Sequence, residues 1–168
     1  PGSKGKEGRM SKKKSGIVLI AIVIFGLGFI LNQQMAADRD VPADDEIALH
    51  IQLDIDRDIG LLVFDYYADG QEHSGGVSNA DRSLMKPNSD LIQVWNRQEL
   101  NSSSDTVELS IQFRMITEYV EPNFENVYPE DITQYIDTPI SFHAHFGEAY
   151  FITITGDQAS GYKAVLNG

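Results

Sequence analysis

The chain has 168 residues, the size of about one domain, and 42% of them are apolar, so a wholly disordered protein is excluded. It contains no cysteine, which excludes disulfides, thiolate metal sites, a cysteine nucleophile and a lipid-modified cysteine. The formal net charge is -12, from 25 acidic and 13 basic residues, and this balance argues against nucleic acid as a partner.

Basic residues gather at the N-terminus, ahead of a long apolar run. Residues 1–15 contain six Lys or Arg and one Glu, whereas residues 38–168 contain seven basic and 24 acidic residues. The segment 16–31 has no charge, and its extension through residue 37 is long enough to cross a bilayer as a helix. Because the basic side stays in the cytoplasm, we expect residues 1–15 inside the cell and the acidic domain outside.

Two interpretations of this apolar segment remain open. A cleaved secretory signal would be cut best after Ala37, but that cut places Met35 where a small residue is preferred. The apolar run is at or beyond the upper length for signal peptides, so we favour an uncleaved, single-pass signal anchor over 16–37, with the lipid bilayer as its partner. Residues 1–9 are interpreted as untranslated in the native protein, because Met10, followed by Ser11 and three lysines, reads as a bacterial start; an expression tag is the alternative.

The remainder of the chain predicts β-structure. Residues 38–45 are polar, include Pro42 and read as a linker. Beyond them, apolar residues at 47, 49, 51, 53 and 55 alternate with more polar ones, as in a strand with one buried face. Further strands are predicted over 61–67, 90–96, 106–120, 140–146, 150–155 and 162–166. Residues 71–89 read as a long loop, with room for a short edge strand, and 123–137 as irregular, with one helical turn opened by Pro129.

About seven strands with little helix predict an all-β domain over 46–168, a two-sheet β-sandwich of immunoglobulin-like architecture. Trp95, the only tryptophan, is the candidate for its buried core tryptophan. For the corner at 146–150 we predict a three-residue loop that pairs Phe146 with Tyr150. This antiparallel register also pairs Ala144 with Ile152, so that apolar residues share one face.

Four aspartates form a candidate calcium site. Asp54, Asp56, Asp58 and Asp65 occupy positions 1, 3, 5 and 12 of a loop, a spacing similar to that of calcium-binding loops. The glycine falls at position 7 instead of 6, and strand side chains two residues apart are about 6.6 Å apart, too far to share an ion. Calcium therefore requires the chain to curl near residue 57. The alternative is an acidic turn that faces solvent.

Three histidines raise the question of zinc or copper. His143 and His145 lie on one face of a predicted strand, and His50 faces outward from the first strand. Because the sequence places no third ligand beside them, we favour exposed histidines without a metal, and no cofactor is expected. No catalytic signature is present in the sequence.

These observations predict a non-enzymatic, membrane-anchored, extracytoplasmic interaction module, an accessory subunit of a bacterial envelope complex. A flexible linker of eight residues averages about 15–17 Å end to end, so the domain is expected to work close to the bilayer. The expected partner is a membrane or envelope protein. The alternatives are an extracytoplasmic domain that binds calcium or a glycan, and an envelope hydrolase.

Overall fold

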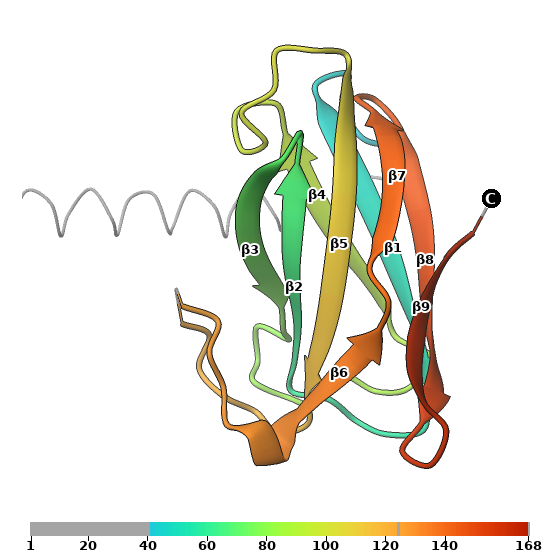
Figure 1. Ribbon diagram of the computed structural model, residues 1–168. Coiled ribbons are helices and arrows are strands. Elements are labelled where there is room, and N and C mark those ends of the chain that lie inside the picture. Colours follow the sequence, from blue (N-terminus) through green and yellow to red (C-terminus); the bar gives the residue numbers. More distant parts are fainter. Residues whose placement is uncertain (1–40, 124, 168) are drawn as a thin grey trace, which may run out of the picture. The chain divides into compact units, whose positions relative to one another are not determined.

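The structure, a computed structural model, describes residues 41–123 and 125–167, and these are all-β (Figure 1). The only other regular element in these ranges is a one-turn 3-10 helix, Glu130–Ile132, which follows Pro129 as predicted. The strands are β1 (Glu46–Ile55), β2 (Leu61–Ala68), β3 (Gln71–Val77), β4 (Asp90–Asn96), β5 (Thr106–Ile116), β6 (Thr133–Asp137), β7 (Ile140–His145), β8 (Ala149–Asp157) and β9 (Gly161–Asn167).

The predicted membrane segment falls outside this part of the chain. Residues 1–15 and 16–37, and the first three linker residues, are not among the described residues. Within 41–123 and 125–167, no helix has the length and apolar character needed to span a membrane.

The strands form one barrel-like sheet with the order β3-β2-β5-β6-β9-β8-β1-β4, and β7 also pairs with β5. The β1–β8 and β6–β9 pairs are parallel, and the other pairs are antiparallel. The sheet has two halves, one of β3, β2, β5 and β7 and the other of β9, β8, β1 and β4. β6 joins them, because its first residues pair with β5 and its last two, Ile136 and Asp137, pair with β9. Two strands, β3 and β4, end the path and leave open edges.

The apolar residues that alternate along the first strand form the centre of the core. Ile47, Leu49, Ile51 and Leu53 of β1 are fully buried, which confirms the predicted strand and its inward face. Trp95 of β4 is 3% exposed, as expected, and its ring lies 6.0 Å from Phe64 and 4.9 Å from Tyr66 between ring centroids.

The predicted hairpin at residues 146–150 is wrong. β7 pairs with β5 and β8 pairs with β1 and β9, so the corner passes from one half of the sheet to the other. Its backbone is held by both halves: Phe146 N–H donates to Asp105 O (3.1 Å), and Gly147 N–H donates to Glu46 O (2.7 Å). The predicted inward face is nevertheless right, because Ala144 and Ile152 are both buried.

Two strands lie where the sequence predicted mostly loop. The tight turn at Asp69 and Gly70, where φ is 48° and 81°, returns the chain directly into β3, a seven-residue edge strand. β6 follows the 3-10 turn inside the stretch predicted to be irregular. Thr138, with φ 63°, and Pro139 then end β6 and separate it from β7.

Candidate functional site

The structure gives each of the four candidate calcium ligands a separate partner. Asp54 lies on β1 and accepts a hydrogen bond from the hydroxyl of Thr155 on β8 (3.4 Å). Just beyond β1, the hydroxyl of Tyr162 donates to Asp56 (2.7 Å), and Arg57 Nε lies 3.6 Å from the same carboxylate. The hydrogen bond from Tyr162 holds the pKa of Asp56 below its ordinary value. Burial, and then this hydrogen bond, raise the pKa of Tyr162 to about 12.

The other two aspartates are paired with basic side chains from distant parts of the sequence. Asp58 forms an ion pair with Lys86. Asp65 of β2 accepts hydrogen bonds from Arg114 on β5 (2.9 Å) and from the hydroxyl of Ser74 on β3 (2.5 Å). Within 41–123 and 125–167, no group of three or more His, Cys, Asp or Glu side chains is placed to hold a metal ion. The structure therefore does not bring the four aspartates together.

Of the three candidate histidines, two lie together on β7 and the third, His50, lies apart from them on β1. His143 and His145 are exposed on β7, opposite Glu108 and Thr106 of β5. His50 lies on β1, between its cross-strand neighbours on β4 and β8. Of these three histidines, His50 lines a concave surface.

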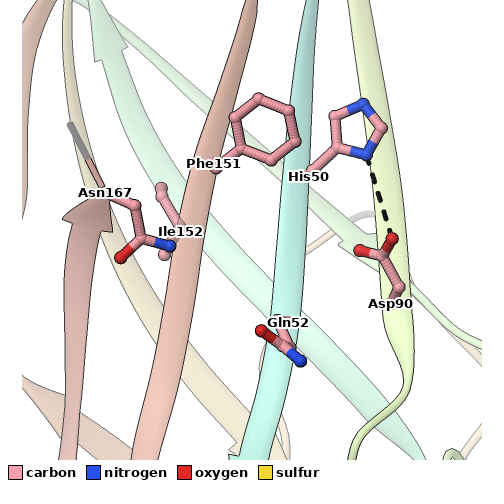
Figure 2. A pocket seen from close by; sticks show the side chains of 6 residues that line it. All are labelled: His50, Gln52, Asp90, Phe151, Ile152 and Asn167. Carbon is pink, nitrogen blue, oxygen red and sulfur yellow. Dashed lines mark ion pairs between the residues drawn. The ribbon is translucent and has the colours of Figure 1, made fainter. Parts of the chain in front are cut away.

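This surface is a shallow hollow on the outside of the sheet, over β4, β1, β8 and β9. The rings of His50 and Phe151, which are direct neighbours on β1 and β8, stack with centroids 4.8 Å apart (Figure 2). His50 Nδ1 lies 4.0 Å from Asp90 Oδ2, and the histidine side chain is only 12% exposed. His50 Nε2 is buried and has no hydrogen-bond partner among the residues described. Such an unsatisfied polar atom is costly inside a protein.

The hollow has a volume of about 200 Å³ and combines one aromatic face with several polar groups. Its lining is His50, Gln52, Asp90, Phe151, Ile152 and Asn167. The amide nitrogen of Asn167 donates to Thr153 (3.0 Å), which leaves its carbonyl oxygen available. An aromatic ring and polar side chains of these types are chemically suited to stacking and to hydrogen bonding.

Five apolar residues occupy outward positions of the four strands that carry the hollow, and we call them the outer face: Ala48, which is only 3% exposed, and Ile92, Val94, Phe151 and Val165. The register places Val94 beside Ala48 and Ile92 beside His50, on the side of the sheet opposite the buried Ile47 and Leu49. Phe151 is 51% exposed and Val165 is 44% exposed.

Sequence reasoning placed His50 on the outward side of its strand but missed the site. The hollow forms because β1 and β8 are parallel neighbours, so that His50 pairs with Phe151 although 101 residues separate them. Nothing in either segment alone specifies that pairing. Comparison of the chain with protein-family models, curated proteins and solved structures finds no match.

Proposed function

We propose that the chain is a non-enzymatic, membrane-anchored extracytoplasmic interaction module that acts as an accessory subunit of an envelope complex. One observation carries this proposal: the outer face presents Phe151 and Val165, 51% and 44% exposed, on the side of the sheet that faces solvent. In a sheet with one solvated face, the outward positions are normally polar. Grouped exposed apolar side chains mark surfaces that bind other molecules.

The proposed location follows from the sequence. Residues 16–37 are the anchor, with the N-terminus in the cytoplasm and the acidic domain outside the cell membrane. β1 starts at Glu46, only a few residues beyond the anchor, so the outer face stays within reach of other membrane proteins. We also propose an immunoglobulin-like sandwich; in support, β3, β2, β5 and β7 form one group of paired strands, and β9, β8, β1 and β4 another.

The test is crosslinking of the full-length protein in its own membrane, followed by identification of the captured protein. Phe151→Ser removes the exposed ring of the outer face. Tyr135→Ser is the matched control, because Tyr135 is a similarly exposed aromatic residue (55%) on β6. We expect the wild type and Tyr135→Ser to capture one defined partner and Phe151→Ser to lose it. Capture that is equal in all three would contradict the proposed role of the outer face.

The composition of the hollow favours a second candidate function, saccharide binding. The hollow in Figure 2 holds a half-exposed ring and the side chains of Gln52, Asp90 and Asn167, and this combination suits a sugar, which stacks its apolar face and hydrogen-bonds through its hydroxyls. Isothermal titration of the full chain with cell-envelope oligosaccharides tests this candidate. We expect Phe151→Ala to weaken binding at least about tenfold, which corresponds to the loss of about 1.4 kcal/mol. No heat with any oligosaccharide would reject it.

A further inference from the structure

The strand β3 has a free backbone edge. Among the strands of residues 41–123 and 125–167, it is the last of the sheet and pairs only with β2. Asp69 N–H donates to Glu108 O on β5, so the next residue back, Ala68, directs its backbone groups toward β3 and forms the hydrogen-bonded pair with Gln71. By alternation, Glu72, Ser74 and Gly76 point their N–H and C=O groups away from the sheet.

None of the three outward residues has a hydrogen bond from its main chain to any other described residue beyond β2. The edge thus offers three N–H donors and three C=O acceptors in the spacing of a strand. Another extended backbone matches this spacing and can pair with the whole row.

Four common protections against pairing are absent from β3; on one face, the side-chain amide of the loop residue Asn126 donates to the Ser74 hydroxyl (2.6 Å). Proteins commonly block edge strands with lysine, proline, a bulge or a very short strand. The sequence of β3, QEHSGGV, is seven residues long, contains no lysine or proline, and has one charged residue, Glu72. Its register with β2 runs without interruption from Gln71 to Val77, so there is no bulge.

Side chains on both faces hold β3 in place, so the edge is ordered before anything binds. On one face, the ring of His73 stacks on Tyr66 with centroids 5.0 Å apart, and Gly75 lies against the ring of Phe64. On the other face, Ser74 donates to Asp65 (2.5 Å). An ordered edge loses little conformational entropy when a strand is added.

Charge decides between two kinds of added strand. Antiparallel pairing of two copies about Ser74 would place Glu72 opposite Gly76, which is sterically acceptable. The chain, however, has a formal net charge of -12, and the turn and strand at this edge contain Asp69 and Glu72 but no lysine or arginine. Two such acidic domains repel each other, whereas a basic segment is attracted.

We propose that β3 binds an extended, lysine- or arginine-rich segment of the envelope partner by strand addition. The inference rests on the proposed function and names the chemistry of the partner. Backbone hydrogen bonds to Glu72, Ser74 and Gly76 provide the affinity, and the acidic turn selects a basic segment.

Glu72→Pro is the discriminating variant. Proline removes the outward N–H of residue 72 and places a ring on the free edge, while the ladder to β2 does not use that N–H. Glu72→Gln is the matched control, because it keeps the donor and removes only the charge. In the membrane crosslinking experiment, we expect Glu72→Pro to reduce capture at least about tenfold. Glu72→Gln should reduce capture several-fold at low salt and little at high salt.

A second measurement keeps the inference testable without a captured partner. The full chain in detergent is titrated with a synthetic peptide of alternating lysine and valine, and with the same peptide N-methylated at alternate residues on both edges. We expect the first peptide to bind and the methylated peptide, which has equal charge, not to bind. Equal binding of the two would show attraction by charge alone and would overturn the inference.

The outcomes separate this inference from the proposed function. If Glu72→Pro keeps the unfolding midpoint of the wild type and still captures the partner, strand addition is wrong while the proposed function stands. If Glu72→Pro does not fold, the methylated peptide decides. If the wild type captures no partner, the proposed function fails, and the two peptides alone decide whether the edge binds a basic strand.

Discussion

Gly60 offers a sharp test of the packing between the start of β2 and the segment that follows β5. It lies just before β2, and its N–H donates to Ile116 O (2.8 Å). A Cβ at this position would lie 2.0 Å from the carbonyl oxygen of Glu118 and 2.6 Å from the nitrogen of Tyr119. Both atoms belong to the backbone, so no side-chain rotation relieves the overlap. Gly60→Ala must therefore displace one of the two segments.

The cost follows from what the displacement disturbs. The two segments must separate by about 1 Å to restore contact distances, because overpacking forces the backbone to shift. Such a shift weakens the Gly60–Ile116 hydrogen bond and leaves buried groups unsatisfied, at about 1–3 kcal/mol. Overpacking adds about 1–3 kcal/mol, and the stiffer unfolded chain returns about 0.4–1 kcal/mol. The expected loss is about 3 kcal/mol of the free energy of unfolding.

Gly70→Ala is the matched control, because alanine at this position meets no steric overlap and is opposed only by the backbone conformation. Gly70 has φ 81° but no atom within 4 Å of a Cβ, so only the backbone conformation opposes alanine. That penalty is about 1 kcal/mol. The assay is urea unfolding of the full chain in detergent, followed by the fluorescence of Trp95, which is the only tryptophan and is buried. A Gly60→Ala variant no less stable than Gly70→Ala would refute the reasoning.

Three further predictions concern the titratable groups and calcium. Burial raises the pKa of Glu99, because the charged carboxylate is disfavoured inside the fold. Above that pKa the charged side chain lowers the free energy of unfolding, and this loss of stability disappears when acid protonates the group. Glu99→Gln should therefore raise the urea midpoint at about pH 7 and leave it unchanged at about pH 3. The pKa of Asp56 is lower in the folded protein than in the unfolded chain. The ionised Asp56 therefore stabilises the fold above its unfolded pKa, and this stabilisation is lost as the pH falls through its folded pKa. Tyr162→Phe should reduce this loss, so the urea midpoints of wild type and variant should differ most near neutral pH and converge in acid. Finally, added Ca²⁺ or a chelator should leave the urea midpoint unchanged, because Asp54, Asp56, Asp58 and Asp65 have separate partners. A midpoint that rises with Ca²⁺ and then saturates would instead support the predicted calcium site.

The strands that the sequence predicted well are those with one fully buried face. In β1 and β5, burial selects an apolar residue at every second position, so local composition reports the structure. β3 has no such pattern, because the residues that pack against the core are a histidine stacked on Tyr66 and a glycine that lies against the ring of Phe64. The edge strand was therefore predicted only as an option within a loop.

Long-range pairing was the part that sequence could not supply. Alternation predicted correctly that Ala144 and Ile152 face the core, but burial is satisfied equally by a hairpin and by a crossover between the halves. The backbone bonds of Phe146 and Gly147 to other segments decide between them. The same limit hid the hollow, because the adjacency of His50 and Phe151 depends on a parallel partner far along the chain.

The parallel pairing of β1 and β8 has a consequence for how the domain matures. Ala48 meets Ala149 in this pair, so the first strand waits for almost the whole domain before its ladder is complete. Pairings of such high sequence separation form slowly. β4 is available earlier and pairs with β1 over Glu46–Gln52, whereas the other edge of β1 has no partner strand until β8 has been made. A chain cut short before β8 would therefore present β1 as an open edge strand, and the C-terminal strands close an edge at which an unfinished domain pairs with other chains.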